Sequence, residues 1–160
     1  MRKAVIPGSF DPLTNGHLDI INRASLIFDS VTVLICENPN KKTLFSIKER
    51  VEMARIIFKN RPNIIVDSTS GLVVQYAKEH AASFIVKGLR DSEDYRYERD
   101  LEMNNKFIVP EVETVFLFSK KENISTRSSS IKEFVKYGVD ISNFVPQIVW
   151  EEIKKKNIFN

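Results

Sequence analysis

Short apolar runs alternate along the chain with stretches in which apolar residues recur at helical spacing. Residues 31–36 form a continuous run rich in β-branched side chains, which is typical of a strand covered on both faces. After His17, by contrast, Ile20, Ile21 and Ala24 keep the phase of one buried helix face. The whole pattern predicts strands at 3–7, 31–36, 64–66, 84–86 and 114–118, and helices from about 17, over 46–58, 72–80, 94–107 and 130–138, and from 146.

The alternation of strands and helices defines the fold class. Strand–helix units of about 25–30 residues indicate βαβ crossovers, which build a parallel sheet. We therefore predict an α/β protein with a Rossmann-like parallel sheet and helices on both faces. A chain of 160 residues fits one domain, so residues 1–160 are assigned to a single domain.

Local signals mark several helix ends. Ser46 and Ser130 each stand three residues before a glutamate, the S-x-x-E capping box that opens a helix. Gly138 suits the position just past a helix end. Pro146 suits the first turn of the last helix.

Composition and charge exclude several classes of protein. Hydrophobic residues make up 42% of the chain, too many for a disordered protein. The net charge of +3 is too small to indicate a nucleic-acid partner, and the run 31–36 is too short to span a membrane. With no secretory signal and a single cysteine, Cys36, we expect a cytoplasmic protein with a reduced thiol.

Polar residues collect directly after the predicted strands. Open parallel sheets bind their ligands beyond the carboxyl ends of the strands. The segments there are rich in hydroxyls, glycines and cations but poor in acids; they are 8–17, 38–42, 87–90 and 119–130. These groups suit an anionic ligand, most simply a polyphosphate.

His17 is the most informative single residue. It shares the phase of Ile20 and Ile21, so its side chain is expected to point toward the sheet rather than to solvent. It also lies in the first turn of its helix, where free N–H groups and the helix dipole favour an anion. Because a glycine-bearing loop ends directly before it at Gly16, we interpret His17 as a ligand-binding residue rather than a core histidine.

Several common catalytic arrangements do not occur in the sequence. The phosphate motifs G-x-x-x-x-G-K-[ST] and G-x-G-x-x-G are absent. No G-x-S-x-G turn and no nucleophile–base pair is evident. Zinc is not expected, because His80 is remote from His17 and there is no second cysteine.

The first polar segment resembles a known family signature. Residues 8–12, Gly-Ser-Phe-Asp-Pro, and 14–17, Thr-Asn-Gly-His, are similar to the nucleotidyltransferase pattern G-[TS]-F-D-x-x-[HT]-x-G-H. The threonine form of the second half resembles the bacterial phosphopantetheine adenylyltransferase family. The likeness covers essentially the whole chain; further matches lie at 41–42, 87–90, 94–98, 103–104, 110–111 and 128–133.

The resemblance implies a reaction and its participants. Members of this family transfer the adenylyl group of ATP to 4′-phosphopantetheine, giving dephospho-coenzyme A and pyrophosphate, with Mg²⁺ as cofactor. This is the penultimate step of coenzyme A biosynthesis, and it proceeds by direct in-line attack without a covalent enzyme intermediate. Family members are cytoplasmic, typically homohexameric and inhibited by coenzyme A, and neither a nucleic acid nor a membrane is an expected partner.

The resemblance also implies roles for individual residues. His17 would stabilise the transition state, with Lys41 and Arg90 as further catalytic residues. Substrate binding is implied for Ser9, Lys41, Val73 and Lys87. ATP binding is implied for Ser9, Phe10, His17, Gly88, Leu89, Arg90, Glu98, Asn123, Ile124, Ser125, Thr126, Arg127, Ser128 and Ser129. No direct Mg²⁺ ligand is assigned, since the triphosphate and water could hold the metal.

Two departures from the family pattern concern cations. Lys87 replaces the usual arginine, which keeps the charge but loses the bidentate fork, so the grip on phosphate is expected to weaken. The late loop reads Thr-Arg-Ser-Ser at 126–129 where the family commonly has I-S-S-S, which adds Arg127 beside the predicted triphosphate site.

Two other functions stay open on the residues alone. Small nucleotidyltransferases that act on nicotinamide mononucleotide, or on CTP with a polyol phosphate, usually have H-x-G-H, whereas this chain has Thr14 in the first position. A non-catalytic nucleotide-binding sensor on the same fold is the second alternative. The intact Ser9, His17, Lys41 and Arg90 argue against that sensor.

Overall fold

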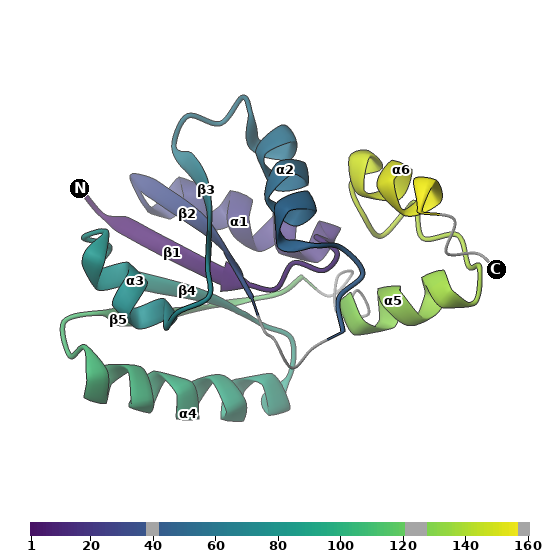
Figure 1. The fold of residues 1–160 in the computed structure, drawn as a ribbon. Helices are drawn as coiled ribbons and strands as arrows, with labels where there is room; N and C mark the ends of the chain where they lie inside the picture. The colour runs from purple at the N-terminus through teal and green to yellow at the C-terminus, as the bar shows by residue number, and fades with distance from the viewer. Residues whose placement is uncertain (38–41, 121–127, 157–160) are drawn as a thin grey trace.

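A computed structural model, which describes residues 1–37, 42–120 and 128–156, contains in those ranges a five-stranded parallel sheet with helices on both faces (Figure 1). The elements in chain order are β1 (Lys3–Gly8), α1 (Asn15–Ile27), β2 (Ser30–Cys36), α2 (Ile47–Phe58), β3 (Ile64–Thr69), α3 (Val73–Glu79), β4 (Phe84–Leu89), α4 (Ser92–Ile108), β5 (Glu113–Phe118), α5 (Ser128–Lys136) and α6 (Gln147–Lys155). The predicted α/β class and parallel sheet are confirmed.

The order of the strands reverses at β1. It reads β3-β2-β1-β4-β5, so the first half of the chain extends the sheet on one side of β1 and the second half extends it on the other. All neighbouring pairs in this sheet are parallel. The carboxyl ends of β1 and β4 therefore flank a topological switch point, where open parallel sheets bind their ligands.

Each face of the sheet packs against its own hydrophobic core. Successive side chains of β1 alternate between the two, with Ala4 and Ile6 in one core and Val5 in the other. The first core includes buried residues of α1, α2, α5 and α6, and the second includes residues of α3. No helix in the described ranges has the length and apolar composition that a membrane crossing needs.

Two of the predicted helix ends are confirmed. Ser46 caps α2, because its hydroxyl accepts the Glu49 N–H at 3.3 Å and the Glu49 carboxylate accepts the Ser46 N–H at 2.7 Å. Gly138 follows α5 with a φ of 69°, a conformation that costs glycine little. Pro146 stands at the N-cap of α6, one residue before the first turn in which it was expected.

The predicted start of α5 is wrong. The capping box at Ser130 placed the helix start there, but Ser128 is already helical and Ser130 lies inside α5. Ser128 is fixed by a tertiary contact, since its hydroxyl donates to the Pro12 carbonyl at 3.0 Å. A local pattern cannot report such a contact, and S-x-x-E also occurs inside helices.

β4 is longer than the sequence pattern indicated. Lys87, Gly88 and Leu89 were expected to be a loop after residue 86, but they continue the strand. Each pairs with a residue of β5, from Lys87 with Phe116 to Leu89 with Phe118. Strand pairing thus overrides the local preference of a Lys-Gly sequence for a loop.

Candidate active site

The loop between β1 and α1 forms one side of a cavity at the switch point. Phe10 adopts a φ of 46°, which turns its ring back over the end of β1. A Cβ on Gly8 would lie 2.8 Å from the tip of that ring, so only glycine fits there without a shift. The Phe10 ring meets His17 edge to face, with centroids 5.1 Å apart. The glycine and the turn together place an aromatic side chain beside the histidine.

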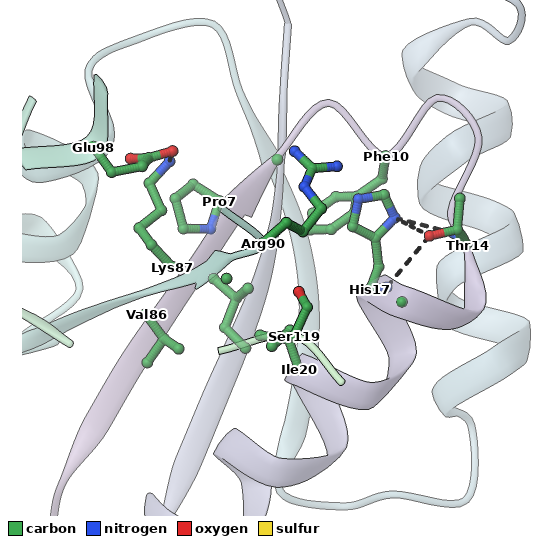
Figure 2. A pocket seen from close by; sticks show the side chains of 14 residues that line it. Pro7, Phe10, Thr14, His17, Ile20, Val86, Lys87, Arg90, Glu98 and Ser119 are labelled. Carbon is green, nitrogen blue, oxygen red and sulfur yellow. Dashed lines mark hydrogen bonds and ion pairs between the residues drawn. The ribbon is translucent and has the colours of Figure 1, made fainter. Parts of the chain in front are cut away.

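His17 is held by the residue that caps its own helix. The Thr14 hydroxyl accepts the His17 N–H at 3.3 Å, and His17 Nδ1 accepts the Thr14 N–H at 3.0 Å. Because Nδ1 is an acceptor, the neutral ring carries its proton on Nε2. Figure 2 shows this second ring nitrogen on the side away from Thr14, beside Arg90. Among the described residues it has no hydrogen-bond partner, so it is available to a ligand.

The surroundings of His17 keep the ring uncharged. Burial lowers the pKa of His17 to about 4, because the charged form loses its hydration, and the nearby Arg90 guanidinium adds repulsion. The ring is therefore neutral at physiological pH. A neutral imidazole with its proton on Nε2 is a hydrogen-bond donor that adds no charge of its own to the site.

The end of β4 supplies two cations that are held in ion pairs. Lys87 Nζ lies 3.0 Å from Glu98 Oε1 of α4. Arg90 donates through Nε to Asp94 Oδ2 at 2.8 Å, and its backbone N–H donates to the same oxygen at 3.1 Å. Asp94 in turn belongs to the first turn of α4. The two carboxylates thus orient both cations toward the end of the sheet.

These groups line one cavity (Figure 2). Its walls come from β1, the β1–α1 loop, α1, β4 and α4, and include Phe10, His17, Lys87, Gly88, Arg90 and Glu98. Gly88 lies against α1, since a Cβ there would be 3.1 Å from Ile20 Cγ1. The cavity combines an apolar wall with a neutral donor and two cations, which suits an anionic ligand that has an aromatic part.

Asp11 ties the β1–α1 loop to two other segments. Its carboxylate accepts the N–H groups of Leu44 and Phe45, each at 2.9 Å, and the Lys132 ammonium of α5 lies 3.3 Å away. Asp11 is only 1% exposed. The aspartate of the family signature therefore fixes the loop and does not line the cavity.

The predicted site residues fall into three groups. Those that line the cavity are Phe10, His17, Lys87, Gly88, Arg90 and Glu98. Those at the same edge of the sheet but not in the lining are Ser9, Leu89, Val73, Ser128 and Ser129; Leu89 is buried and Val73 packs on the second core. Those outside the described residues are Lys41, Asn123, Ile124, Ser125, Thr126 and Arg127.

Sequence reasoning missed three contributors to the site. From the sequence, Thr14 is recognised only as a position of the family signature, although Thr14 orients His17. Asp94, in the first turn of α4, holds the Arg90 side chain, although Arg90 itself precedes the helix. Ser119, directly after β5, falls within the predicted polar segment 119–130 but is not among the predicted site residues; it joins the cavity lining because β5 is the neighbour of β4.

The carboxylates near the cavity are already engaged by cations. Glu98 is held by Lys87 and Asp94 by Arg90. The described ranges contain no group of three or more histidine, cysteine, aspartate or glutamate side chains that could hold a metal ion.

Comparison with known proteins first defines the class. The family model for cytidylyltransferase-like proteins matches residues 5–134, so the chain belongs to this class of nucleotidyltransferases. A solved structure from Vibrio parahaemolyticus, described as a candidate nicotinate-nucleotide adenylyltransferase, superimposes with a TM-score of 0.71. It covers 99% of this chain and 96% of its own at 18% identity, which supports the fold alone.

Curated relatives then identify the family within that class. A phosphopantetheine adenylyltransferase of Alkaliphilus metalliredigens is 46% identical over 157 residues, covering 98% of this chain and 100% of the relative. The corresponding protein of Carboxydothermus hydrogenoformans is 47% identical over 156 residues, covering 98% and 96%. The chain therefore belongs to the phosphopantetheine adenylyltransferase family, as its motifs predicted.

Proposed function

We propose that this protein transfers the adenylyl group of ATP to 4′-phosphopantetheine, giving dephospho-coenzyme A and pyrophosphate. The observation that carries the proposal is the neutral His17 ring, whose Nε2–H has no partner among the described residues and lies beside the Arg90 guanidinium at the switch point. A preorganised donor next to a fixed cation suits a reaction in which negative charge develops on a phosphate. The names of its relatives describe the same activity.

The chemistry consists of one displacement at phosphorus. A phosphate oxygen of 4′-phosphopantetheine attacks the α-phosphorus of ATP. The bond from that phosphorus to the oxygen that bridges to the β-phosphate breaks, and pyrophosphate leaves with the electron pair. The attacking monoester has a second pKa of about 6, so it is already a dianion in large part at neutral pH. No side chain has to act as nucleophile or base, which agrees with the absence of such a pair from the sequence.

The chain's own contribution is positioning and charge stabilisation. His17 Nε2–H donates to an α-phosphate oxygen, and the bond strengthens as negative charge develops there. Arg90, fixed by Asp94, neutralises charge on the ATP phosphates. Lys41 lies outside the described residues, and we assign it the same task on the substrate side. Of these three catalytic residues, His17 is the one whose contacts define a protonation state.

The remaining ATP-binding assignments follow the shape of the cavity. Gly88 lets the triphosphate approach the backbone of β4, and the Phe10 ring supplies an apolar wall. Glu98 Oε1 accepts from Lys87, which leaves Oε2 for a donor group on ATP. The other ATP-binding residues we propose are Ser9, Leu89 and those at 123–129.

The pantetheine side of the site rests on fewer contacts. Lys87 lines the cavity with its ammonium 3.0 Å from Glu98, so the substrate phosphate would become its second anionic partner. Ser9 is the first residue of the loop after β1, and we assign its hydroxyl to the substrate phosphate. Val73, the first residue of α3, is proposed to contact the pantetheine arm.

Mg²⁺ is proposed to enter together with ATP. Because the described carboxylates at the cavity are engaged and hold no metal-binding cluster, the ligands would be triphosphate oxygens and water. The ion would supply charge neutralisation on the leaving pyrophosphate. The chain would recognise this complex through its cations rather than through metal ligands.

Assembly and regulation are proposed on the family resemblance with some support from the surface. α4 has no buried residue, and it exposes Tyr97, Met103 and Phe107. A helix with such an apolar surface suits burial between copies of the chain, so we propose a homohexamer. Coenzyme A carries the same pantetheine arm as the product and is proposed as a feedback inhibitor. Both substrates are cytoplasmic metabolites, and we place the protein in that compartment.

A substrate panel tests the proposed function. Purified protein is incubated with Mg²⁺, ATP and 4′-phosphopantetheine, and pyrophosphate release is measured. Parallel reactions contain ATP with nicotinamide mononucleotide, or CTP with glycerol 3-phosphate. We expect release in the first mixture alone. Release only in one of the other two would identify another nucleotidyltransferase, and no release in any mixture would favour the non-catalytic sensor.

A further inference from the structure

Two charged side chains in the described residues are buried, and both hold the β1–α1 loop. Asp11 is 1% exposed and Arg50 is 4% exposed. The Asp11 charge is compensated by the Lys132 ammonium and by backbone N–H groups. Arg50 differs, because no carboxylate in the ranges 1–37, 42–120 and 128–156 pairs with it. A buried charge without a counter-ion is costly and calls for an explanation.

The contacts of Arg50 show what it holds. It stands on α2, and its Nη1 donates to the Ser9 carbonyl at 2.7 Å. Its Nε donates to the Ser46 carbonyl at 3.4 Å, within the same helix cap. The short bond therefore joins α2 to the loop that carries Ser9 and Phe10. Removing the guanidinium would leave the Ser9 carbonyl without its donor.

This bond fixes the orientation of one peptide group. The peptide between Ser9 and Phe10 is trans, so its N–H points opposite to the carbonyl that Arg50 holds. The Phe10 N–H has no acceptor among the described residues, although Phe10 lines the cavity. A carbonyl that accepts from a charged donor polarises its own N–H, which becomes a stronger donor.

The charge of Arg50 also acts at the carboxyl end of the sheet. Burial raises the pKa of the Cys36 thiol at the end of β2, whereas a Gly8 backbone hydrogen bond and the charges of Lys87 and Arg50 lower it. Lys87 lines the cavity, so the thiol lies within the field of a site cation and of Arg50 together. The Arg50 guanidinium, with which no carboxylate of the described residues pairs, thus adds positive potential behind the loop where phosphates are expected.

We propose that Arg50 is a positioning residue of this site. It fixes the Ser9–Phe10 peptide so that the Phe10 N–H and the Ser9 hydroxyl meet the phosphates, and the bound anion balances its charge, with which no described carboxylate pairs. Arg50 itself touches no reacting atom. The inference rests on the proposed function, because it assigns this peptide to the two phosphorylated substrates.

The test compares Arg50→Gln and Arg50→Lys with a matched control. Glutamine can still donate to the Ser9 carbonyl but removes the charge, whereas lysine keeps the charge and one donor. The control is Arg61→Gln, since Arg61 also joins two elements, donating to Ser25 and Asn22, but lies before β3 at the opposite edge of the sheet. KM for ATP and for 4′-phosphopantetheine, kcat and Tm are measured for all four proteins.

The split between KM and kcat separates positioning from a purely structural role. We expect Arg50→Gln to raise KM for at least one substrate by about 10- to 100-fold, the scale for losing a charged hydrogen bond. Arg50→Lys should keep KM within about threefold of wild type, because the charge remains. Arg61→Gln should lower Tm without changing either KM. An unchanged KM in Arg50→Gln, equal losses in both Arg50 variants, or the same KM rise in Arg61→Gln would each overturn the proposal.

Two further measurements keep the inference separate from folding and from the assigned reaction. Should Arg50→Gln fail to fold, Arg50→Lys decides alone, and a tenfold rise of KM in that folded variant would overturn the proposal. Should the wild type release no pyrophosphate, the proposed function fails, and calorimetric binding of inorganic pyrophosphate replaces KM. Weaker binding by Arg50→Gln than by Arg61→Gln supports the role of Arg50, and equal binding overturns it.

Discussion

His17 derives its chemistry from a residue three positions earlier. Thr14 accepts the His17 N–H and donates its own N–H to Nδ1, so a single helix cap sets the ring orientation and the tautomer. Burial and the Arg90 charge then keep that tautomer neutral. The cap thus determines both the position and the protonation state of the proposed transition-state donor.

Replacing His17 by alanine tests this role. We expect His17→Ala to fold with a Tm close to wild type and to lose about 10²- to 10³-fold in kcat, the scale for one transition-state donor. The matched control is His80→Gln, since His80 stacks on Tyr76 on the other face of the sheet. Steady-state kinetics and thermal unfolding of both variants provide the measurement. Near-wild-type turnover of His17→Ala would contradict the assignment.

The lowered pKa of His17 predicts how stability depends on pH. The folded pKa is about 4, below the ordinary value of 6.5, so the unfolded chain binds a proton at His17 before the folded chain does. This stabilisation is complete above pH 6.5 and is lost as the pH falls toward 4. In denaturant titrations across this range, His17→Gln should show a smaller loss of unfolding free energy than wild type. Equal losses in the two proteins would show that the ring titrates normally.

At the residue scale, the sequence predicted His17 from its helical phase, but not its tautomer. The tautomer depends on a backbone N–H that faces Nδ1 only when Thr14 is extended, with a ψ of 166°. The position of Arg50 carries a signal in the sequence, because Arg50 lies three and four residues before Met53 and Ala54 on the buried face of α2. A charged residue on an apolar face needs a partner. Which partner it has, the Ser9 carbonyl, follows only from the tertiary structure.

At the scale of elements, the β1–α1 loop shows how a short motif builds a site. Gly8 makes room for the Phe10 ring, Asp11 ties the loop to residues 44–45 and α5, and Thr14 starts α1. Each of these signature residues therefore has a separate structural role. We propose that the histidine at the end of the motif carries the chemistry.

Gly8→Ala should disturb this loop more than a comparable substitution elsewhere. The added Cβ would lie 2.8 Å from the Phe10 ring, and overpacking of this kind costs about 1–3 kcal/mol. The ring would also move at the cavity wall, so KM for ATP should rise. Gly71→Ala is the control, because its Cβ would meet nothing closer than Thr69 Oγ1 at 3.5 Å. If both variants show the same unfolding free energy and the same KM for ATP, the close approach of Phe10 to Gly8 contributes neither to stability nor to ATP binding.

The existence of the elements could be predicted, whereas some of their limits could not. Apolar runs and helical phase located all the strands and helices found in the described residues. β4 extends through Lys87 and Gly88 because β5 pairs with it, a contact that is distant in sequence and lies at the cavity. Ser128 is already helical ahead of the predicted capping box, and its hydroxyl contacts Pro12.

For the whole molecule, the strand order is the decisive property. It brings β1 and β4 side by side, so that a loop near residue 10 and a strand end near residue 90 line one cavity. Periodicity alone predicted a parallel sheet but not which strands are neighbours. The approach of Gly88 to Ile20 follows from that order.

The surface of α4 leads to a prediction about assembly. Phe107 is 90% exposed on a helix without buried residues, so burial between copies of the chain would stabilise an oligomer. We expect Phe107→Glu to dissociate the proposed hexamer in analytical ultracentrifugation. Leu26→Glu, at a side chain 84% exposed on α1, is the control and should leave the assembly intact. If the Phe107→Glu variant forms an assembly of the same mass as the wild type, α4 is not part of the interface.

The most direct test of the proposed reaction is the identity and stoichiometry of its products. Wild-type protein with Mg²⁺, ATP and 4′-phosphopantetheine is analysed by mass spectrometry for dephospho-coenzyme A and, in the same samples, for pyrophosphate. We expect the two products in equal amounts, neither of them when 4′-phosphopantetheine is omitted, and far slower formation by His17→Ala. Pyrophosphate without dephospho-coenzyme A, or neither product from the wild type, would contradict adenylyl transfer to 4′-phosphopantetheine.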